Sequence, residues 1–168
     1  MTPPLWALSI AYWSHMLATV LWIGGLAVLC LLALPAARKT LEPQAYARFL
    51  EVSRSRLDPL GWFSIMVLLA SGMVQMSSSP HYEGFLSIQG LWGGVILIKH
   101  LLFGIMVITS GVVTWGLMPA LRRAALLKAR GKKAPGQGKL ERWSLRLMQF
   151  NLALGVLVLL LTAVARSA

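Results

Sequence analysis

The segment LWALSIAYWSHMLATVLWIGGLAVLCLLAL, from Leu5 to Leu34, contains no Asp, Glu, Lys or Arg and only one histidine, His15. A charge-free apolar run of more than about 18 residues is typical of a transmembrane helix, because a helix of that length crosses the hydrocarbon core of a bilayer. An ionisable side chain inside such a helix is costly to insert and therefore indicates a functional site. The segment thus predicts a membrane-spanning helix with a candidate site at His15.

The composition of the whole chain is that of an integral membrane protein. Its 168 residues are 57% hydrophobic and 12% charged, with a net charge of +11. Of the sixteen Lys and Arg residues, five fall in 35–58 and nine in 119–146. This concentration follows the positive-inside rule and makes nucleic-acid binding the weaker explanation of the charge. We therefore expect a multi-pass protein of the bacterial inner membrane, with the lipid bilayer and not nucleic acid as its partner.

Hydrophobic runs and the residues that interrupt them predict an all-α fold, a four-helix transmembrane bundle in which residues 1–168 form a single domain. Pro35 with Arg38-Lys39 favours the end of the first helix, and Pro119 favours the end of the third. Because the basic connections should stay inside the cell, both termini are expected on the outer, periplasmic side. The predicted helices are residues 5–34, 60–77, 91–118 and 143–165.

Two histidines fall at similar depths on two helices that both begin on the outer side. His15 lies ten residues after Leu5, about 15 Å along the helix. His100 lies nine residues after Leu91, about 13 Å along the helix. Four-helix bundles hold cofactors between facing helices, and histidine is a common haem ligand, so this pattern predicts haem b with His15 and His100 as iron ligands. Small residues share the face of each histidine: Ala11, Ala18 and Thr19 for the first, Gly93, Gly104 and Gly111 for the second.

Alternatives to the haem hypothesis remain open at this point. The small residues are also those that allow transmembrane helices to pack closely. Lys99 would act as counter-ion for a haem propionate, or would extend its ammonium group to the outer headgroups. A haem protein would need an electron partner, either a quinone, a membrane redox protein or a periplasmic protein, and a homo-oligomer is compatible with the sequence. A cofactor-free accessory subunit of a membrane complex is a further hypothesis.

A copper site is the second functional hypothesis. Met73 and Met76 lie at the outer end of the second predicted helix, and His81 follows in the outer connection. Thioether and imidazole groups suit Cu(I), although methionine is also an ordinary filler of apolar helices. The five acidic residues are expected in connections or at helix ends, which disfavours a proton pump or a cation transporter that uses carboxylates within the membrane: Glu42, Glu51, Asp58, Glu83 and Glu141.

Several short motifs resemble the membrane domain of the copper-resistance CopD family. They are His15-x6-Trp22-x-Gly24-Gly25, Arg56-Leu57, Leu68-Leu-Ala-Ser-Gly72 and Leu97-x-Lys99. The HemJ proteins, which are four-helix haem b proteins linked to protoporphyrinogen IX oxidation, have a similar first-helix motif and third-helix lysine. The resemblance implies that His15 takes the family's histidine position and that Arg56 and Lys99 take its basic positions. Trp22 shares the helix face of His15, seven residues on, and we expect Trp22, Arg56 and Lys99 to bind the cofactor together with the two histidines. If the chain is an enzyme, this resemblance implies an oxidoreductase. His100 is a departure from both patterns.

The charge distribution predicts that residues 131–138 are cytoplasmic and residues 77–83 are external. In intact cells, a membrane-impermeant thiol reagent should label Ser79→Cys but not Gly136→Cys, each made in a Cys30→Ala background. Labelling of position 136 alone would reverse the topology.

Overall fold

The chain forms four long helices in a computed structural model that describes residues 3–80, 90–130 and 136–167. The first runs from Leu5 to Thr40 and comprises α1 (Leu5–Thr19), η1 (Val20–Gly24), α2 (Gly25–Ala27), η2 (Val28–Ala33) and α3 (Leu34–Thr40). The second is α4 (Pro43–Ser77). The third comprises α5 (Gly90–Gly111), η3 (Val112–Leu117) and α6 (Met118–Ala129), and the fourth is α7 (Gln137–Ser167). All four are long and apolar enough to cross a membrane, which confirms the all-α transmembrane fold.

The helices extend further than predicted at the end of the bundle that carries the basic connections. Pro35 and Pro119 do not end their helices; each is the second residue of an α-helical segment that directly follows π-helical turns, η2 and η3. Proline lacks an N–H and crowds the preceding turn, and a local π-helical adjustment accommodates both effects. The predicted loop over 35–58 is likewise helical except near residues 41–42, because α4 begins at Pro43 and continues through Pro59.

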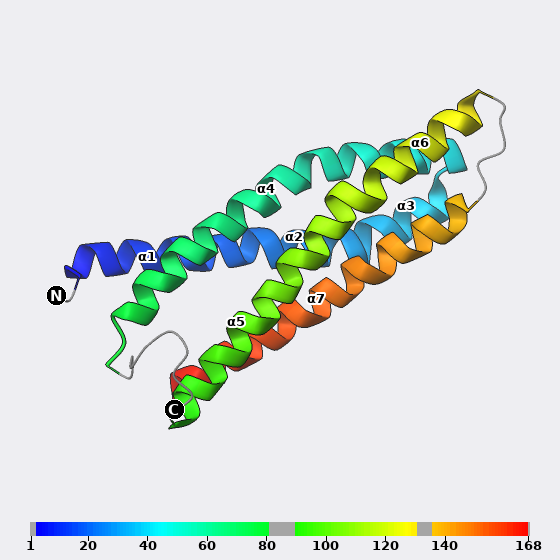
Figure 1. Cartoon of the computed structure of the whole chain (residues 1–168). Coiled ribbons are helices and arrows are strands. Elements are labelled where there is room, and N and C mark those ends of the chain that lie inside the picture. Colours follow the sequence, from blue (N-terminus) through cyan, green and yellow to red (C-terminus); the bar gives the residue numbers. More distant parts are fainter. Residues whose placement is uncertain (1–2, 81–89, 131–135, 168) are drawn as a thin grey trace.

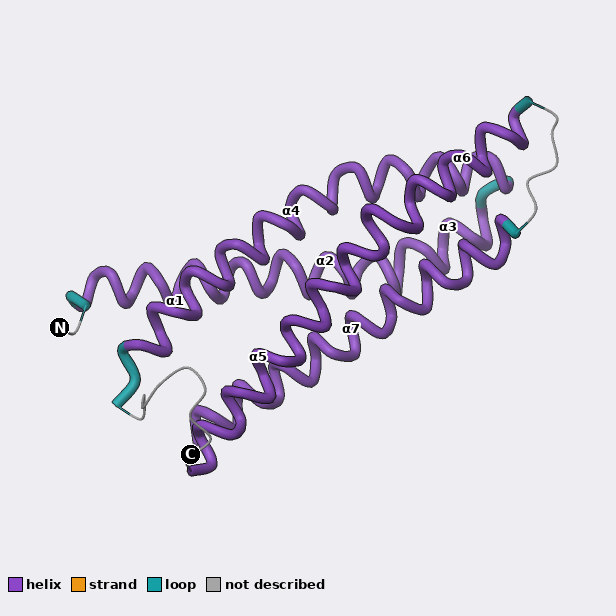
Figure 2. The backbone as a smooth tube through the Cα atoms, in the orientation of Figure 1, coloured by secondary structure: helices purple, strands orange, loops and turns teal. Residues whose placement is uncertain are grey.

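Two helical hairpins make up the bundle. The closest contacts of α1 are with α4, and those of α5 are with α7, while η1, α2 and η2 in the middle of the first helix contact α7. Figures 1 and 2 show the two hairpins lying along each other, with both chain termini at one end of the bundle. We call this end the terminal end, and the opposite end, with Thr40, Pro43 and Ala129, the basic end.

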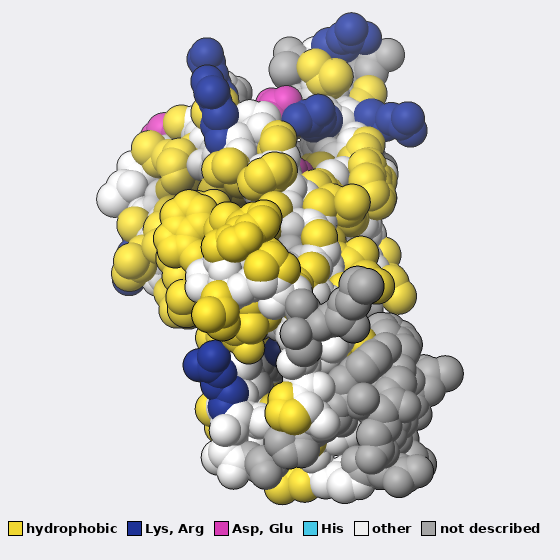
Figure 3. Space-filling model, turned by 90° about the vertical axis from the view of Figure 1, so that its left-hand side faces the viewer, with side chains coloured by type: hydrophobic (Ala, Val, Ile, Leu, Met, Phe, Trp, Pro, Cys, Tyr) yellow, Lys and Arg dark blue, Asp and Glu magenta, His cyan; other side chains and the backbone are white. Residues whose placement is uncertain are grey.

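The core of the bundle is narrow, and most large apolar side chains face outwards. One buried cluster centres on Trp22 and Met106, and a second, nearer the basic end, centres on Leu34 and Met148. The Trp22 ring meets the edge of Phe103 at a centroid distance of 5.8 Å. In Figure 3, hydrophobic side chains cover the middle of the visible face, and most Lys and Arg side chains lie towards its upper edge. This apolar surface fits a lipid environment.

Gly155 of α7 provides a test of the packing between the hairpins. A Cβ atom at Gly155 would lie 3.3 Å from Ile23 Cδ1 and 3.3 Å from Met106 Cε. Gly155→Val adds two further methyl groups there, so we expect it to lower the stability by about 1–3 kcal/mol, the usual cost of overpacking. The matched control is Gly104→Val, since a Cβ at Gly104 would meet no atom within 4 Å. Thermal unfolding in detergent should show a lower Tm for Gly155→Val alone, and equal Tm values would contradict this packing.

Candidate functional site

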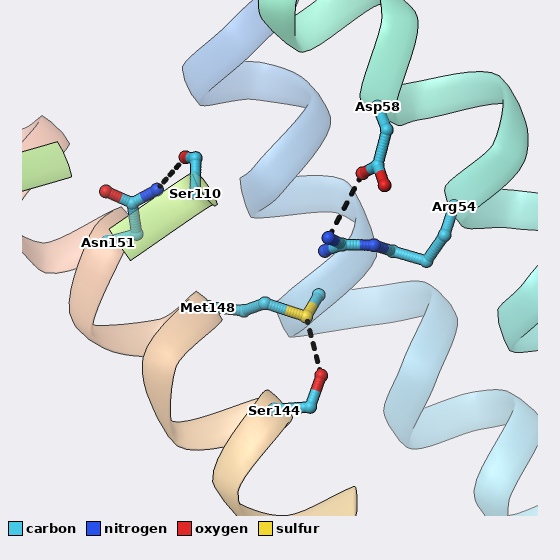
Figure 4. Close-up of polar contacts among 6 residues, drawn as sticks. All are labelled: Arg54, Asp58, Ser110, Ser144, Met148 and Asn151. Atoms are coloured by element: carbon cyan, nitrogen blue, oxygen red, sulfur yellow. Dashed lines mark hydrogen bonds and ion pairs between the residues drawn. The ribbon is translucent and has the colours of Figure 1, made fainter. Parts of the chain in front are cut away.

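Polar side chains from three helices meet inside the half of the bundle nearer the basic end. Figure 4 shows Arg54 and Asp58 of α4 on one side, with Ser110 of α5 and Asn151 of α7 on the other. Between them lies a cavity of about 60 Å³, and the Trp22 and Trp62 rings also line it. We call this group of residues the polar cluster, comprising Arg54, Asp58, Ser110, Thr114 and Asn151.

A buried ion pair forms the charged part of the polar cluster. Arg54 Nη2 lies 3.1 Å from Asp58 Oδ1, and the Arg54 residue is only 6% exposed. The two residues are one helical turn apart, which places both side chains on one face of α4. A charge in an apolar interior is tolerated only when it is paired, and Asp58 supplies the pairing. The expectation that no carboxylate lies within the bundle was wrong for Asp58, because α4 begins fifteen residues before it.

Hydrogen bonds connect the rest of the polar cluster. Asn151 Nδ2 donates to Ser110 Oγ over 2.8 Å, which joins α7 to α5. Thr114 of the third helix lines the same cavity as Asp58 of α4. Beside the cavity, the Met148 sulfur accepts a hydrogen bond from Ser144 Oγ at 3.8 Å. The cluster therefore links α4, α5 and α7 across the interior.

His15 lies at the contact of α1 with α4, nearer the terminal end. Its Nδ1 is 2.8 Å from Ser71 Oγ, and Ser71 donates its own hydroxyl proton to the Val67 carbonyl. The Ser71 oxygen must therefore accept the bond, so His15 carries a proton on Nδ1 and, when neutral, has the lone pair on Nε2. The ring packs beside Gly72, where a Cβ would lie 3.4 Å from His15 Cε1, an ordinary van der Waals distance. A histidine oriented in this way is a typical metal ligand.

The second predicted ligand, His100 of α5, has a similar hydrogen bond at Nδ1. This nitrogen lies 2.7 Å from the Ile96 carbonyl oxygen, which can only accept, so Nδ1 is again the donor. Lys99, the preceding residue, is partly buried in α5. The principal contacts of α1 in the described structure are nevertheless with α4 and not with α5.

The other residues singled out from the sequence occupy different environments. Met76 is 9% exposed, whereas Met73 is 53% exposed, so the two thioethers do not share an interior site. Trp22 is 6% exposed and lines the cavity of the polar cluster. Arg56 is exposed, two residues away from the buried Arg54. His81 lies outside the described residues. Within residues 3–80, 90–130 and 136–167, no three His, Cys, Asp or Glu side chains gather as a metal-binding group.

Sequence reasoning missed Arg54, Ser110 and Asn151. Arg54 and Asp58 are four residues apart, which is the spacing of an ion pair on one helical face. This spacing could have predicted the pair from the sequence. Ser110 and Asn151 are single polar residues in apolar helices, and such residues commonly face the interior of a membrane bundle. Their pairing across two helices has no sequence signal.

The buried ion pair provides a test of the polar cluster. Arg54→Leu leaves the Asp58 carboxylate without its partner, so we expect a loss of about 3–5 kcal/mol in unfolding free energy, and Asp58→Leu in the same chain should restore much of it. The matched control is Arg122→Leu, because Arg122 Nε lies 3.2 Å from Glu51 Oε1 but both side chains are more than half exposed, at 55% and 53%. That change should cost less than about 1 kcal/mol. Equal losses in denaturant titrations of the two variants would contradict the assignment.

Comparison with known proteins shows the family to which the chain belongs. The family model for copper resistance protein D (CopD) matches residues 51–165, which contain the whole polar cluster, His100 and Lys99 but not His15. No curated protein and no solved structure matches the chain. The match covers more than half of the sequence and confirms the resemblance inferred from the short motifs. The chain therefore belongs to the copper resistance protein D family.

Proposed function

We propose that this chain is a copper-handling protein of the bacterial inner membrane that takes up the ion at its terminal end, with His15 as the principal ligand. The observation that carries the proposal is the hydrogen bond from His15 Nδ1 to Ser71, which leaves the Nε2 lone pair as the metal ligand. The family match supports copper as the ion. Copper is here the transported substrate and not a resident cofactor.

A buried thioether lies on the same face of α4 as the residue that His15 contacts. Met76 is one helical turn beyond Gly72, the residue that His15 contacts, and it is buried. Between them, Gln75 Nε2 donates to the Ala11 carbonyl over 3.1 Å and holds α4 against α1 at this level. An ion entering from the terminal end would therefore meet Met76 before His15. Thioether and imidazole groups together favour Cu(I) over harder divalent ions.

The proposal predicts that His15→Ala abolishes copper accumulation by cells that express the protein, and that Met76→Leu reduces it severalfold. The matched control is Met73→Leu, which makes the same change on the same helix at a lipid-facing position and should leave accumulation unchanged. Total cellular copper is the measurement, with membrane levels of each variant determined in parallel. Wild-type accumulation by His15→Ala, at normal membrane levels, would refute the role of His15.

Haem b between His15 and His100 is a second candidate, favoured by the hydrogen bond of His15 Nδ1, which leaves Nε2 of that ring as a potential ligand. Neither histidine lines the cavity of about 60 Å³ at the polar cluster or the second one of about 40 Å³. Electron transfer to a quinone or another redox protein, and porphyrinogen oxidation, depend on this candidate. A Soret band with stoichiometric iron in the purified protein would favour it over copper handling.

A further inference from the structure

The outward face of α7 carries an ordered series of side chains. Since successive residues of a helix are about 100° apart, residues 139, 142, 143, 146, 150, 157 and 160 all fall within an arc of about 100°. Every one of them is exposed. Nearest the basic end lie Lys139, Arg142, Trp143 and Arg146, and towards the terminal end follow Phe150, Leu157 and Leu160. The face is therefore cationic where α7 begins and apolar beyond that point.

The positive charge of this face is not neutralised within the described structure. No ion pair in residues 3–80, 90–130 and 136–167 includes Lys139, Arg142 or Arg146. The one acidic residue of α7 is Glu141, which lies two residues after Lys139 and hence about 200° around the helix. It accepts a hydrogen bond from Gln137 of the same helix over 2.9 Å. The three cations are thus available to an anionic group outside the chain.

The lengths of the cationic and apolar parts match one leaflet of a bilayer. Lys139 and Arg146 are seven residues apart, about 10 Å along the helix, and the headgroup layer is about 5–7 Å thick on each side of a membrane. Phe150 and Leu160 are ten residues apart, about 15 Å along the helix, which is half of a hydrocarbon core of about 30 Å. Trp143, which is 50% exposed, lies among the cations at the headgroup level that indole rings prefer.

Charge and shape together select the occupant of this face. A free phosphate ion would use the cations but not the apolar part. A second copy related by a two-fold axis would bring the same cations of both chains together, and like charges repel each other. A zwitterionic lipid carries an ammonium group, which the three cations also repel. An acidic phospholipid fits both parts, because it has a net negative headgroup and apolar chains.

We propose that this face of α7 binds one acidic phospholipid. Arg142 and Arg146, one helical turn apart, donate hydrogen bonds to its headgroup phosphate, and Lys139 adds a further positive charge. One acyl chain lies along Phe150 and the two leucines. The inference is independent of the proposed copper function, because it involves neither His15 nor the interior of the bundle.

Native mass spectrometry of the full-length protein tests the proposal. The protein in detergent is incubated with equal amounts of phosphatidylglycerol and phosphatidylcholine that have the same acyl chains, so that only the headgroup differs. We expect the wild type to retain one phosphatidylglycerol severalfold more often than one phosphatidylcholine. Equal retention of the two lipids would overturn the proposal. So would a dimer that survives in detergent and is lost in Trp143→Ala, because a second copy would then cover this face.

Two double variants test where the lipid binds. Arg142→Gln with Arg146→Gln should reduce the preference for phosphatidylglycerol severalfold, and the fold should persist because both positions are exposed. The matched control is Arg48→Gln with Arg56→Gln, which removes the same charge from exposed positions of α4. This control should keep the wild-type preference. An unchanged preference in the α7 variant would contradict the site, and equal reductions in both variants would show instead that the basic end attracts acidic lipid as a whole.

Discussion

The basic half of the bundle depends on the ion pair between Arg54 and Asp58. A transmembrane bundle gains little from burying apolar side chains, because lipid solvates them equally well, so polar contacts in the interior determine which helix faces meet. Arg54 and Asp58 lie on one face of α4, and the cavity beside them is also lined by Thr114 and by the hydrogen-bonded Asn151 and Ser110. A buried polar group that loses its partner destabilises the folded state. The three helices are therefore expected to keep the one relative position in which these groups are paired.

The terminal half is organised differently. There α1 packs on α4, and its polar contacts run between these two helices, through His15 with Ser71 and through Gln75 with the Ala11 carbonyl. Trp22 separates the two halves: it lies in the apolar core with Ala18 and Met106, and it also lines the cavity of the polar cluster. His15 and the polar cluster thus lie on opposite sides of Trp22.

Much of the fold follows from the sequence because the charge-free run 5–34 and three similar runs admit only membrane helices. The helix ends were less predictable. Pro35 and Pro119 normally indicate termination, but the π-helical turns before them, which have no sequence signature, let both helices continue. The sequence predicted Arg56 as the basic residue of the site, but the structure buries Arg54 instead. Two residues correspond to about 200° around a helix, so Arg54 and Arg56 point to nearly opposite sides of α4. His15 was proposed as a candidate site residue because an ionisable group in an apolar run is rare, and its role stays a prediction.

The central claim is that His15 provides a Cu(I) site within the bundle. The most direct measurement is the Cu(I) content and affinity of the purified protein, determined by competition with a chromophoric Cu(I) chelator, with iron and the absorption spectrum recorded on the same sample. The account predicts one Cu(I) ion per chain that is lost in His15→Ala and retained in Met73→Leu. Absence of Cu(I) binding by the wild-type protein, or stoichiometric haem iron with a Soret band, would contradict it.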